Sequence, residues 1–274
     1  FLDYWDIDDS YIDIVMMWVH NRPMQYIMTF LYQDMGEYEG TFVRNMLKLN
    51  NIITNLTNVA QLINNIDLVD KLKSIGVQNI IVKTDSDLPE SFQKEFSNIL
   101  QYKRGYGYCI WKPYIIQQEL NILQEDEILI YIDSTDYPES LFFDIVSSHL
   151  EKNDLFLVNR GYNHGQWTKR DCFVLMECDE KKYHDHVQLE AGVLGLKKTE
   201  FTQKLISEWF EYSKNENILT EIPNISGQEN LPTFREHRYD QSILTNLSIK
   251  YNLNSFRFPL HVIKYNYNQP QIYG

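Results

Sequence analysis

A carboxylate stands where this sequence first suggests chemistry. Asp133 directly follows the apolar run Ile128–Ile132, which is typical of a strand buried on both faces. Open α/β sheets bind their ligands at the carboxyl ends of such strands. We therefore expect Asp133 to face a ligand at the edge of a central sheet.

Two cationic residues precede this strand. Lys112 stands at the head of a helix predicted over Lys112–Leu123, because Pro113 suits a first helical turn and an apolar stripe follows it. Helix N-termini favour phosphate, so Lys112 is a candidate contact for an anionic ligand. Arg104, in the Gly-aromatic stretch KRGYGY, is a second candidate. The alternative for Lys112 is a surface lysine whose amine stays in water while its stem packs on apolar side chains.

The elements that must position these residues follow an α/β pattern. Helical spacing over Thr41–Ile75 ends at Gly76, and a short strand follows at Asn79–Val82, which is the order of a parallel crossover. Further strands are predicted at Tyr11–Val19, Asp154–Val158 and Val187–Leu196, further helices at Thr199–Tyr212 and Tyr239–Tyr251, and a strand or short helix at Gln25–Tyr32. The polar stretch Asn215–Glu236 is predicted to be a functional loop. We expect a mixed, mostly parallel sheet flanked by helices.

Composition favours one folded domain over residues 1–274. The chain is 43% hydrophobic, and no linker-like or repeated segment divides it. With 38 acidic and 25 basic residues the net charge is −13, which argues against non-specific binding to nucleic acid or anionic membrane. Three scattered cysteines predict reduced thiols in a cytoplasmic protein. No apolar stretch is long enough for a transmembrane span.

Several short motifs in a fixed order resemble a known family. The sequence contains RGYGY, WKP, the apolar run ending at Asp133, QLEAG, EW and HRYDQS, in that order. Together they are similar to nucleotide-sugar glycosyltransferases of the GT-A fold, in particular bacterial and viral members with RGxGYWxWKP and HRxDQS blocks, and more distantly the glycogenin and lipopolysaccharide galactosyltransferase group. The resemblance covers about Gly76–Lys264. It implies a GT-A-like, Rossmann-like domain that transfers a hexose from a nucleoside diphosphate sugar to a hydroxyl acceptor such as a glycan.

The resemblance also implies a metal. A diphosphate leaving group gains negative charge as the glycosidic bond breaks, so a divalent metal or fixed cations must meet it. By resemblance, Asp133, Asp136 and His261 are the expected ligands of Mn²⁺ or Mg²⁺. Thr135 stands where the family has its second carboxylate, so that carboxylate is displaced by one residue to Asp136.

Further donor contacts follow from the resemblance. Lys264 matches a diphosphate-binding lysine, Lys112 and Arg104 match cationic donor contacts, and Gln241 belongs to the HRYDQS block. The alternative for the segment containing His261 and Lys264 is a half-buried edge strand with a solvated lysine.

Three residues are candidates for catalysis. Asp240 matches a family carboxylate near the transferred sugar or the acceptor, although an aspartate at a helix start also serves as a cap. Gln188 and Glu190 lead into Ala191-Gly192, where the glycine leaves room for a sugar. Strand parity places both side chains on one face unless a bulge intervenes. Their alternative is the polar face of an edge strand.

Other interpretations remain open. Asp85-Ser86-Asp87 is a formal Asp-x-Asp, but the following Leu-Pro predicts turn hydrogen bonds instead. His184 and His186 lack further metal ligands in sequence. The run ILIYIDSTD also resembles haloacid-dehalogenase phosphatases, although Thr135 stands at the position of their second aspartate. The displaced carboxylate also permits a binding module that keeps the fold without turnover.

Overall fold

The computed structural model describes residues 14–19, 69–70, 72–77, 79–133, 136–138, 140–257, 262–266 and 269–271; within 14–19, 136–138, 140–141, 262–266 and 269–271 it describes the backbone alone. The predicted segment Gln25–Tyr32, most of Thr41–Ile75, and His261 lie outside the described residues.

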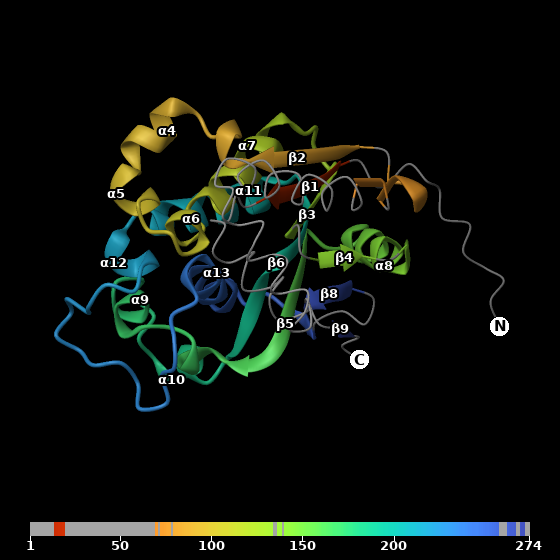
Figure 1. Cartoon of the computed structure of the whole chain (residues 1–274). Helices are drawn as coiled ribbons and strands as arrows, with labels where there is room; N and C mark the ends of the chain where they lie inside the picture. Colours follow the sequence, from red (N-terminus) through yellow and green to blue (C-terminus); the bar gives the residue numbers. More distant parts are fainter. Residues whose placement is uncertain are drawn as a thin grey trace, which may run out of the picture.

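A six-stranded mixed sheet forms the centre of the described structure (Figure 1). Its strand order is β2-β1-β3-β6-β5-β7. The bounds are β1 Ile14–Val19, β2 Ile80–Thr84, β3 Ile128–Asp133, β5 Leu155–Asn163, β6 Val187–Lys197 and β7 Phe256–Arg257. β1 pairs in parallel with both β2 and β3, whereas β6 is antiparallel to β3 and β5. The carboxyl ends of β2, β1 and β3 therefore share one edge of the sheet.

A second, three-stranded antiparallel sheet follows β3. It consists of β4 Asp136–Pro138, β8 Val262–Asn266 and β9 Gln269–Gln271, in the order β4-β8-β9. Because β4 begins three residues after Asp133, this pairing brings β8 close to the end of β3.

Helices cover both faces of the main sheet. The α-helices are α4 Glu90–Glu95, α5 Ser97–Leu100, α6 Gly105–Tyr108, α7 Trp111–Ile122, α8 Ser140–Leu150, α9 Arg170–Val174, α10 Lys181–His184, α11 Glu200–Ser213, α12 Glu216–Leu219 and α13 Tyr239–Lys250; the 3-10 helices are η2 Asp85–Asp87 and η3 His164–Gln166. None of the helices that the structure describes is both long enough and apolar enough to traverse a bilayer.

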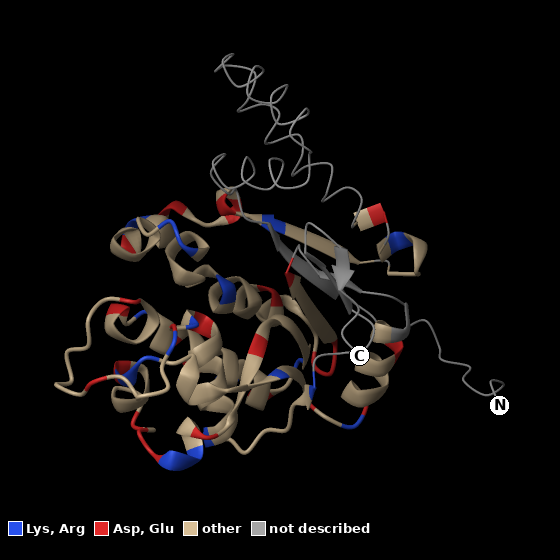
Figure 2. Cartoon of the chain, turned by 60° about the horizontal axis from the view of Figure 1, so that its bottom comes forward, with Lys and Arg blue, Asp and Glu red and all other residues tan. Residues whose placement is uncertain are grey.

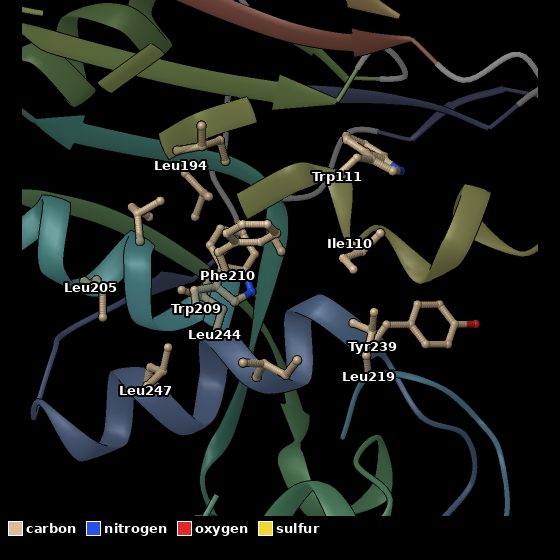
Figure 3. Close-up of a cluster of buried hydrophobic side chains, with 14 of the residues drawn as sticks. Ile110, Trp111, Leu194, Leu205, Trp209, Phe210, Leu219, Tyr239, Leu244 and Leu247 are labelled. Atoms are coloured by element: carbon tan, nitrogen blue, oxygen red, sulfur yellow. The ribbon is translucent and has the colours of Figure 1, made fainter. Parts of the chain in front are cut away.

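The side chains of β3 divide between two hydrophobic clusters. Leu129 and Tyr131 pack into a large cluster with α7, α11 and α13, part of which is drawn in Figure 3. Ile128, Ile130 and Ile132 pack on the opposite face, against α8. This alternation is the reason that the β3 sequence is apolar at consecutive positions. It places β3 in the middle of the fold, with only Asp133 at its end partly exposed.

The turn before α7 has an unusual backbone. Gly105, Tyr106, Gly107, Tyr108 and Cys109 all have positive φ, between 48° and 75°. For a non-glycine residue this conformation costs roughly 1–2 kcal/mol. Two backbone bonds of 2.8 Å, Gly107 N–H to the Tyr102 carbonyl and Tyr108 N–H to the Arg104 carbonyl, hold the turn. Residues 105–109, called the left-handed turn below, therefore fix where α7 begins.

The opposite end of α7 is held by a buried lysine. Lys198 follows β6, and its Nζ donates to the carbonyl oxygens of Leu120 at 2.7 Å and Leu123 at 3.2 Å. A cation at these positions satisfies carbonyl groups that a helix C-terminus leaves without partners and opposes the helix dipole. Both ends of α7 are thus attached to the sheet and its connections, which sets the position of Lys112 in its first turn.

Most predicted elements that fall within the described residues are confirmed. β3 spans Ile128–Asp133 and α7 spans Trp111–Ile122, within one residue of prediction at each end. β5 is longer than predicted because it continues past Val158 to Asn163. α8 was not predicted, and Asn215–Glu236, predicted to be a loop, contains the short helix α12.

We expect the left-handed turn to be sensitive to a single methyl group. A Cβ on Gly107 would lie 3.0 Å from the Leu100 Cα and 3.2 Å from the Ile99 carbonyl oxygen, whereas a Cβ on Gly227, which has nearly the same φ, would meet nothing within 4 Å. Gly227→Ala should therefore cost about 1 kcal/mol of unfolding free energy from backbone strain, and Gly107→Ala about 3 kcal/mol because steric overlap is added. Urea denaturation measures both, and equal losses would contradict the proposed packing of the turn.

Candidate functional site

One buried ammonium group connects four elements at the carboxyl end of β3. The Nζ of Lys112 on α7 lies 3.3 Å from Asp133 Oδ1 on β3 and 3.5 Å from Asp240 Oδ2 on α13. It also donates to the Ala191 carbonyl on β6 at 3.1 Å. The structure thus brings together Lys112, Asp133 and Asp240, which the sequence singled out separately. We refer to these three residues as the Lys112 site.

Three protein oxygens surround the Lys112 ammonium. An ammonium group has three N–H donors. Its three oxygen neighbours here are the Ala191 carbonyl and the two carboxylates. Only 6% of the Lys112 side chain is exposed, so it is not the surface lysine of the alternative interpretation. The rings of Tyr131 and Trp111 lie 5.3 Å and 5.8 Å from the ammonium nitrogen.

Each partner of Lys112 is itself held by a hydrogen bond. The Tyr131 hydroxyl donates to Asp133 Oδ1 at 2.6 Å, from two residues earlier on the same strand. The Trp209 indole N–H on α11 donates to the Asp240 backbone carbonyl at 2.8 Å. Gln241 accepts a hydrogen bond of 3.3 Å from the Ala191 N–H. Gln241, predicted as a donor contact, therefore positions the β6 peptide whose carbonyl binds Lys112.

The charges in this site shift each other's pKa. Burial alone lowers the pKa of Lys112, but Asp133 and Asp240 outweigh it, so the net pKa lies above its ordinary value. Burial raises the pKa of Asp240 to about 6, and the nearby charge of Asp133 adds to this, although Lys112 opposes both. Burial and then the Asp133 charge raise the pKa of Tyr131, which keeps its hydroxyl protonated as a donor.

The two carboxylates differ in exposure and in contacts. The Asp133 side chain is 32% exposed, whereas that of Asp240 is 5% exposed. The Lys112 ammonium lies 3.5 Å from Asp240 Oδ2, an ion-pair separation, and among the described residues this oxygen makes no closer hydrogen bond. Asp133 is therefore the open, oriented carboxylate, and Asp240 is the enclosed one with spare proton affinity.

Arg104 lies apart from the Lys112 site. Its guanidinium contacts both carboxylate oxygens of Glu221 at 3.1 Å and also pairs with Glu236. The same guanidinium lies 5.0 Å from the ring centroid of Tyr239. Arg104 therefore attaches the loop between α12 and α13 to the left-handed turn.

Gln188 and Glu190 make different contacts. Gln188 is buried, and its Oε1 contacts Nδ1 of His164, whereas Glu190 pairs with Arg160 at 2.6 Å. The β5–β6 register moves from Leu157 opposite Leu194 to Val158 opposite Glu190, so a bulge lies between these strands. Neither contact reaches the Lys112 site directly, so catalytic roles for these two residues stay predictions.

The predicted metal ligands are only partly described. Asp136 and Lys264 are Cα partners in the β4–β8 pair, so the second sheet brings their backbones together. His261 lies outside the described residues. Asp133, the one predicted ligand with a described side chain, already contacts the Lys112 ammonium and the Tyr131 hydroxyl. Among the residues that the structure describes, no three His, Cys, Asp or Glu side chains lie together as a metal site would require.

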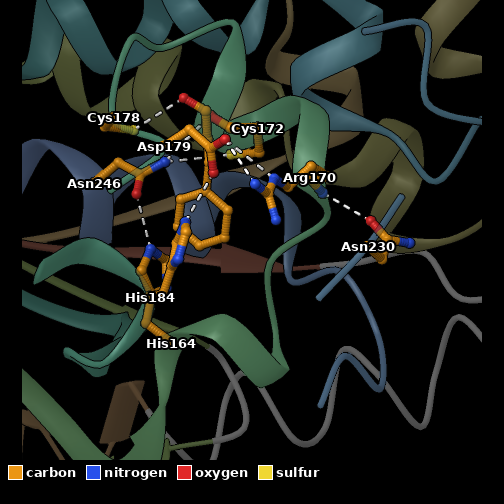
Figure 4. Close-up of polar contacts among 9 residues, drawn as sticks. His164, Arg170, Cys172, Cys178, Asp179, His184, Asn230 and Asn246 are labelled. Carbon is orange, nitrogen blue, oxygen red and sulfur yellow. Dashed lines mark hydrogen bonds and ion pairs between the residues drawn. The ribbon is translucent and has the colours of Figure 1, made fainter. Parts of the chain in front are cut away.

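Sequence reasoning missed a buried polar network behind the site. His164 Nε2 lies 2.8 Å from Asn246 Oδ1, and burial lowers the pKa of His164 to about 4, so the ring is neutral at physiological pH. Figure 4 shows this pair beside Asp179, which binds both His184 and Arg170. These contacts join residues far apart in sequence, and no local pattern indicates them. Tyr131 was also missed, although its two-residue spacing from Asp133 is a usable signal.

Two alternatives are resolved by their contacts. Asp87 Oδ2 accepts from the Thr84 N–H at 2.7 Å and hydroxyl at 2.8 Å, which confirms the predicted turn role of the Asp85-Ser86-Asp87 segment. The second alternative was a metal site at His184 and His186. Both rings contact protein oxygens instead: His184 lies 2.8 Å from Asp179 Oδ1, and His186 Nδ1 lies 3.0 Å from the Val187 carbonyl oxygen.

Comparisons with known proteins add only distant likenesses. The DSHCT (NUC185) domain model matches residues 3–80, less than half of the chain. No curated protein matches the sequence. A protein assigned as a nucleotide-diphospho-sugar transferase from Desulfovibrio desulfuricans G20 is 10% identical, with a TM-score of 0.39, over 91% of this chain and 80% of its own. Mouse xyloside xylosyltransferase 1 is 10% identical, with a TM-score of 0.40, over 89% and 84%. The 4-diphosphocytidyl-2C-methyl-D-erythritol synthase of Anaerococcus prevotii DSM 20548 is 8% identical, with a TM-score of 0.38, over 97% and 94%. At these scores the likeness carries no argument about the activity of this chain.

The pKa of Asp240 predicts a specific pH dependence of stability. Because the pKa of Asp240 is about 6 in the folded state against an ordinary value of 3.8, the folded state holds a proton that the unfolded state releases between these pH values. Stability from this group is therefore full below pH ~4 and is lost as pH rises through 6, by on the order of 2–3 kcal/mol. The unfolding free energy of the native chain minus that of Asp240→Asn should fall by this amount from pH 4 to pH 7.

The matched control is Asp185→Asn, which removes a carboxylate whose side chain is 62% exposed. Its difference from the native chain should be flat over the same pH range. A flat or rising difference for Asp240→Asn would contradict the enclosed position of Asp240.

Proposed function

We propose that this protein is a GT-A-like glycosyltransferase that transfers a hexose from a nucleoside diphosphate sugar to a hydroxyl group of a glycan. The observation that carries the proposal is the Lys112 site, where two carboxylates and one ammonium meet at the carboxyl end of the central strand β3. Ligands of open α/β sheets bind at this edge. The motifs RGYGY, WKP, QLEAG and HRYDQS support the same reading through their order in the sequence.

Asp240 is the proposed proton acceptor. A general base works best when its pKa lies near the working pH, and burial raises the pKa of Asp240 to about 6. Its Oδ2 makes no hydrogen bond to a described residue, so it retains the capacity to accept one from an acceptor hydroxyl. In this role Asp240 takes the hydroxyl proton as the acceptor oxygen bonds to the anomeric carbon and the diphosphate leaves.

For Lys112 we propose a role other than the donor contact that the sequence suggested. All three of its N–H donors have protein oxygen partners within 3.5 Å, so we propose that it positions and stabilises the two carboxylates rather than binding the diphosphate. The leaving diphosphate must then be met by other groups. The predicted candidates are Lys264, Arg104 and a Mn²⁺ or Mg²⁺ ion on Asp133, Asp136 and His261.

A donor screen tests the proposed function. We expect one class of nucleoside diphosphate sugar to raise the melting temperature, because a ligand at 100 times its dissociation constant stabilises the folded state by about 2.7 kcal/mol. The same screen with Mn²⁺ or Mg²⁺ tests whether metal strengthens binding. Asp133→Asn is the control, since it keeps the size of the side chain and should lose the metal-dependent part. No shift with any donor, with or without metal, would count against the proposal.

Asp240→Asn tests the proposed base. The substitution keeps the shape of the side chain and removes its basicity, so the initial rate of transfer should fall at least ~100-fold while donor affinity by calorimetry changes little. Asp185→Asn serves again as the surface control and should transfer at the native rate.

Full activity of Asp240→Asn would rule out the base role and support a helix-start role, which asparagine fills about as well. Donor binding without transfer in the native chain, across the acceptors tried, would favour a nucleotide-sugar binding module on the same fold.

A further inference from the structure

Two aromatic rings and two arginines contact one another around Trp167, and two further arginines lie around the neighbouring Gly161. We define the arginine–tryptophan patch by Arg160, Tyr162, Trp167, Arg235, Arg238 and Arg257. The guanidinium carbons of Arg238 and Arg235 lie 4.9 Å and 5.9 Å from the Trp167 ring centroid. The Tyr162 ring lies 5.9 Å from the Trp167 ring and is 52% exposed. The patch therefore presents both aromatic surface and cationic groups.

The other side of the patch is built on β5. Gly161 has a φ of +75°, and a Cβ there would lie 3.7 Å from the guanidinium of Arg257, which comes from the paired strand β7. Arg160 pairs with Glu190 at 2.6 Å and keeps 24% of its side chain exposed. Gly161 lies between Arg160 and Tyr162 in β5, and the guanidinium of Arg257 lies over it, so the patch continues from Tyr162 to Arg257.

The patch is connected to the proposed proton acceptor. The Trp167 carbonyl accepts hydrogen bonds of 2.9 Å from the Arg238 N–H and from the Ser242 hydroxyl. Arg238 is the N-cap residue of α13, and Asp240 lies in the first turn of that helix. On the β6 side, Glu190 directly precedes Ala191, whose carbonyl binds Lys112. The patch therefore adjoins the start of α13, the helix that carries Asp240 in its first turn.

The local charge contrasts with that of the whole chain. The net charge is −13, and Figure 2 shows acidic and basic residues interspersed over the described structure. Of the 25 basic residues only eight are arginines, and four of these eight are in the patch. Against them stand Glu190 and Glu236, the latter 3.0 Å from Arg238. Arginine rather than lysine suits bidentate contacts to carboxylate and phosphate oxygens.

We propose that the arginine–tryptophan patch binds an anionic sugar, carrying a carboxylate or a phosphate, in the acceptor glycan. The guanidinium groups bind the anionic group, and the rings of Trp167 and Tyr162 pack against the sugar ring, as aromatic side chains do in sites with few polar contacts. The identity of the patch as an acceptor site rests on the proposed function, but binding does not require transfer. The alternative is that these residues only anchor the loop before α13. The ion pair between Arg238 and Glu236 fits that role, but it does not account for the exposed side chains Arg235, Arg257 and Tyr162.

The experiment measures binding by calorimetry without a donor. The probes are a hexuronate oligosaccharide, a hexose phosphate and a neutral oligosaccharide of similar length. We expect one of the two anionic probes to bind at least ~10-fold more tightly than the neutral one, because charge-assisted hydrogen bonds are stronger than neutral ones. Which anionic probe binds more tightly distinguishes a carboxylate ligand from a phosphate ligand.

Two variants locate the site. Arg235→Gln changes an exposed side chain and should weaken the anionic probe about 10-fold while leaving the neutral probe unchanged. Lys181→Gln, at a side chain that is 90% exposed on α10, removes the same charge outside the patch and should change neither. Trp167→Phe keeps an aromatic ring of smaller area, which protects the fold. It should weaken the binding of every probe that binds to the native chain.

Equal binding of anionic and neutral probes, equal effects of Arg235→Gln and Lys181→Gln, or no binding of any probe would each overturn the proposal. Binding that follows these expectations in a chain that transfers no sugar would contradict the proposed function and leave the anion site standing.

Discussion

The described structure depends on one ammonium group placed where water does not reach it freely. An isolated charge buried in this way costs several kcal/mol, so it persists only with close partners. The partners of Lys112 come from three other elements, β3, β6 and α13, and each contact requires its element to approach α7 within a narrow range of distance. The ion contacts therefore specify how the central strand, its antiparallel neighbour and two helices meet. Loss of either carboxylate would leave the ammonium with weaker compensation.

The Lys112 site holds more negative than positive charge. Two carboxylates share one ammonium, so one negative charge remains without an equivalent partner. Asp133 has the Tyr131 hydroxyl and partial exposure to stabilise its charge, whereas Asp240 is buried and has the ammonium at 3.5 Å and the Gln241 backbone N–H. The excess therefore appears as raised proton affinity at Asp240. This difference in charge stabilisation supports the proposed roles. A well-stabilised carboxylate such as Asp133 is a poor base, and an enclosed carboxylate such as Asp240 is a better one.

Sequence patterns predicted the local parts of this arrangement and missed the parts formed by contacts between distant segments. The β3 run and the start of α7 could be placed because apolar continuity and a proline are local signals. Lys112, Asp133 and Asp240 were each singled out, yet their mutual contact depends on the fold. Arg104 was expected at a donor phosphate, but Glu221 and Glu236, more than 100 residues away, determine its contacts. Strand parity could not predict the partners of Gln188 and Glu190, because the β5–β6 register shifts again between Asn159 opposite Leu189 and Asn163 opposite Val187.

Glu236 connects the features on either side of the Lys112 site. It pairs with Arg104, which lies over Tyr239, and with Arg238, which lies over Trp167. Within the proposed function, an anionic sugar that binds Arg238 competes with Glu236 for the same guanidinium. Glu236 would then rely on Arg104 alone. Arg104 lies over the ring of Tyr239, which directly precedes Asp240, and Arg238 is the N-cap residue two positions before Asp240. Because an ion pair and a bound anion draw on the same donors, occupation of the patch and the position of the α13 N-terminus are energetically coupled.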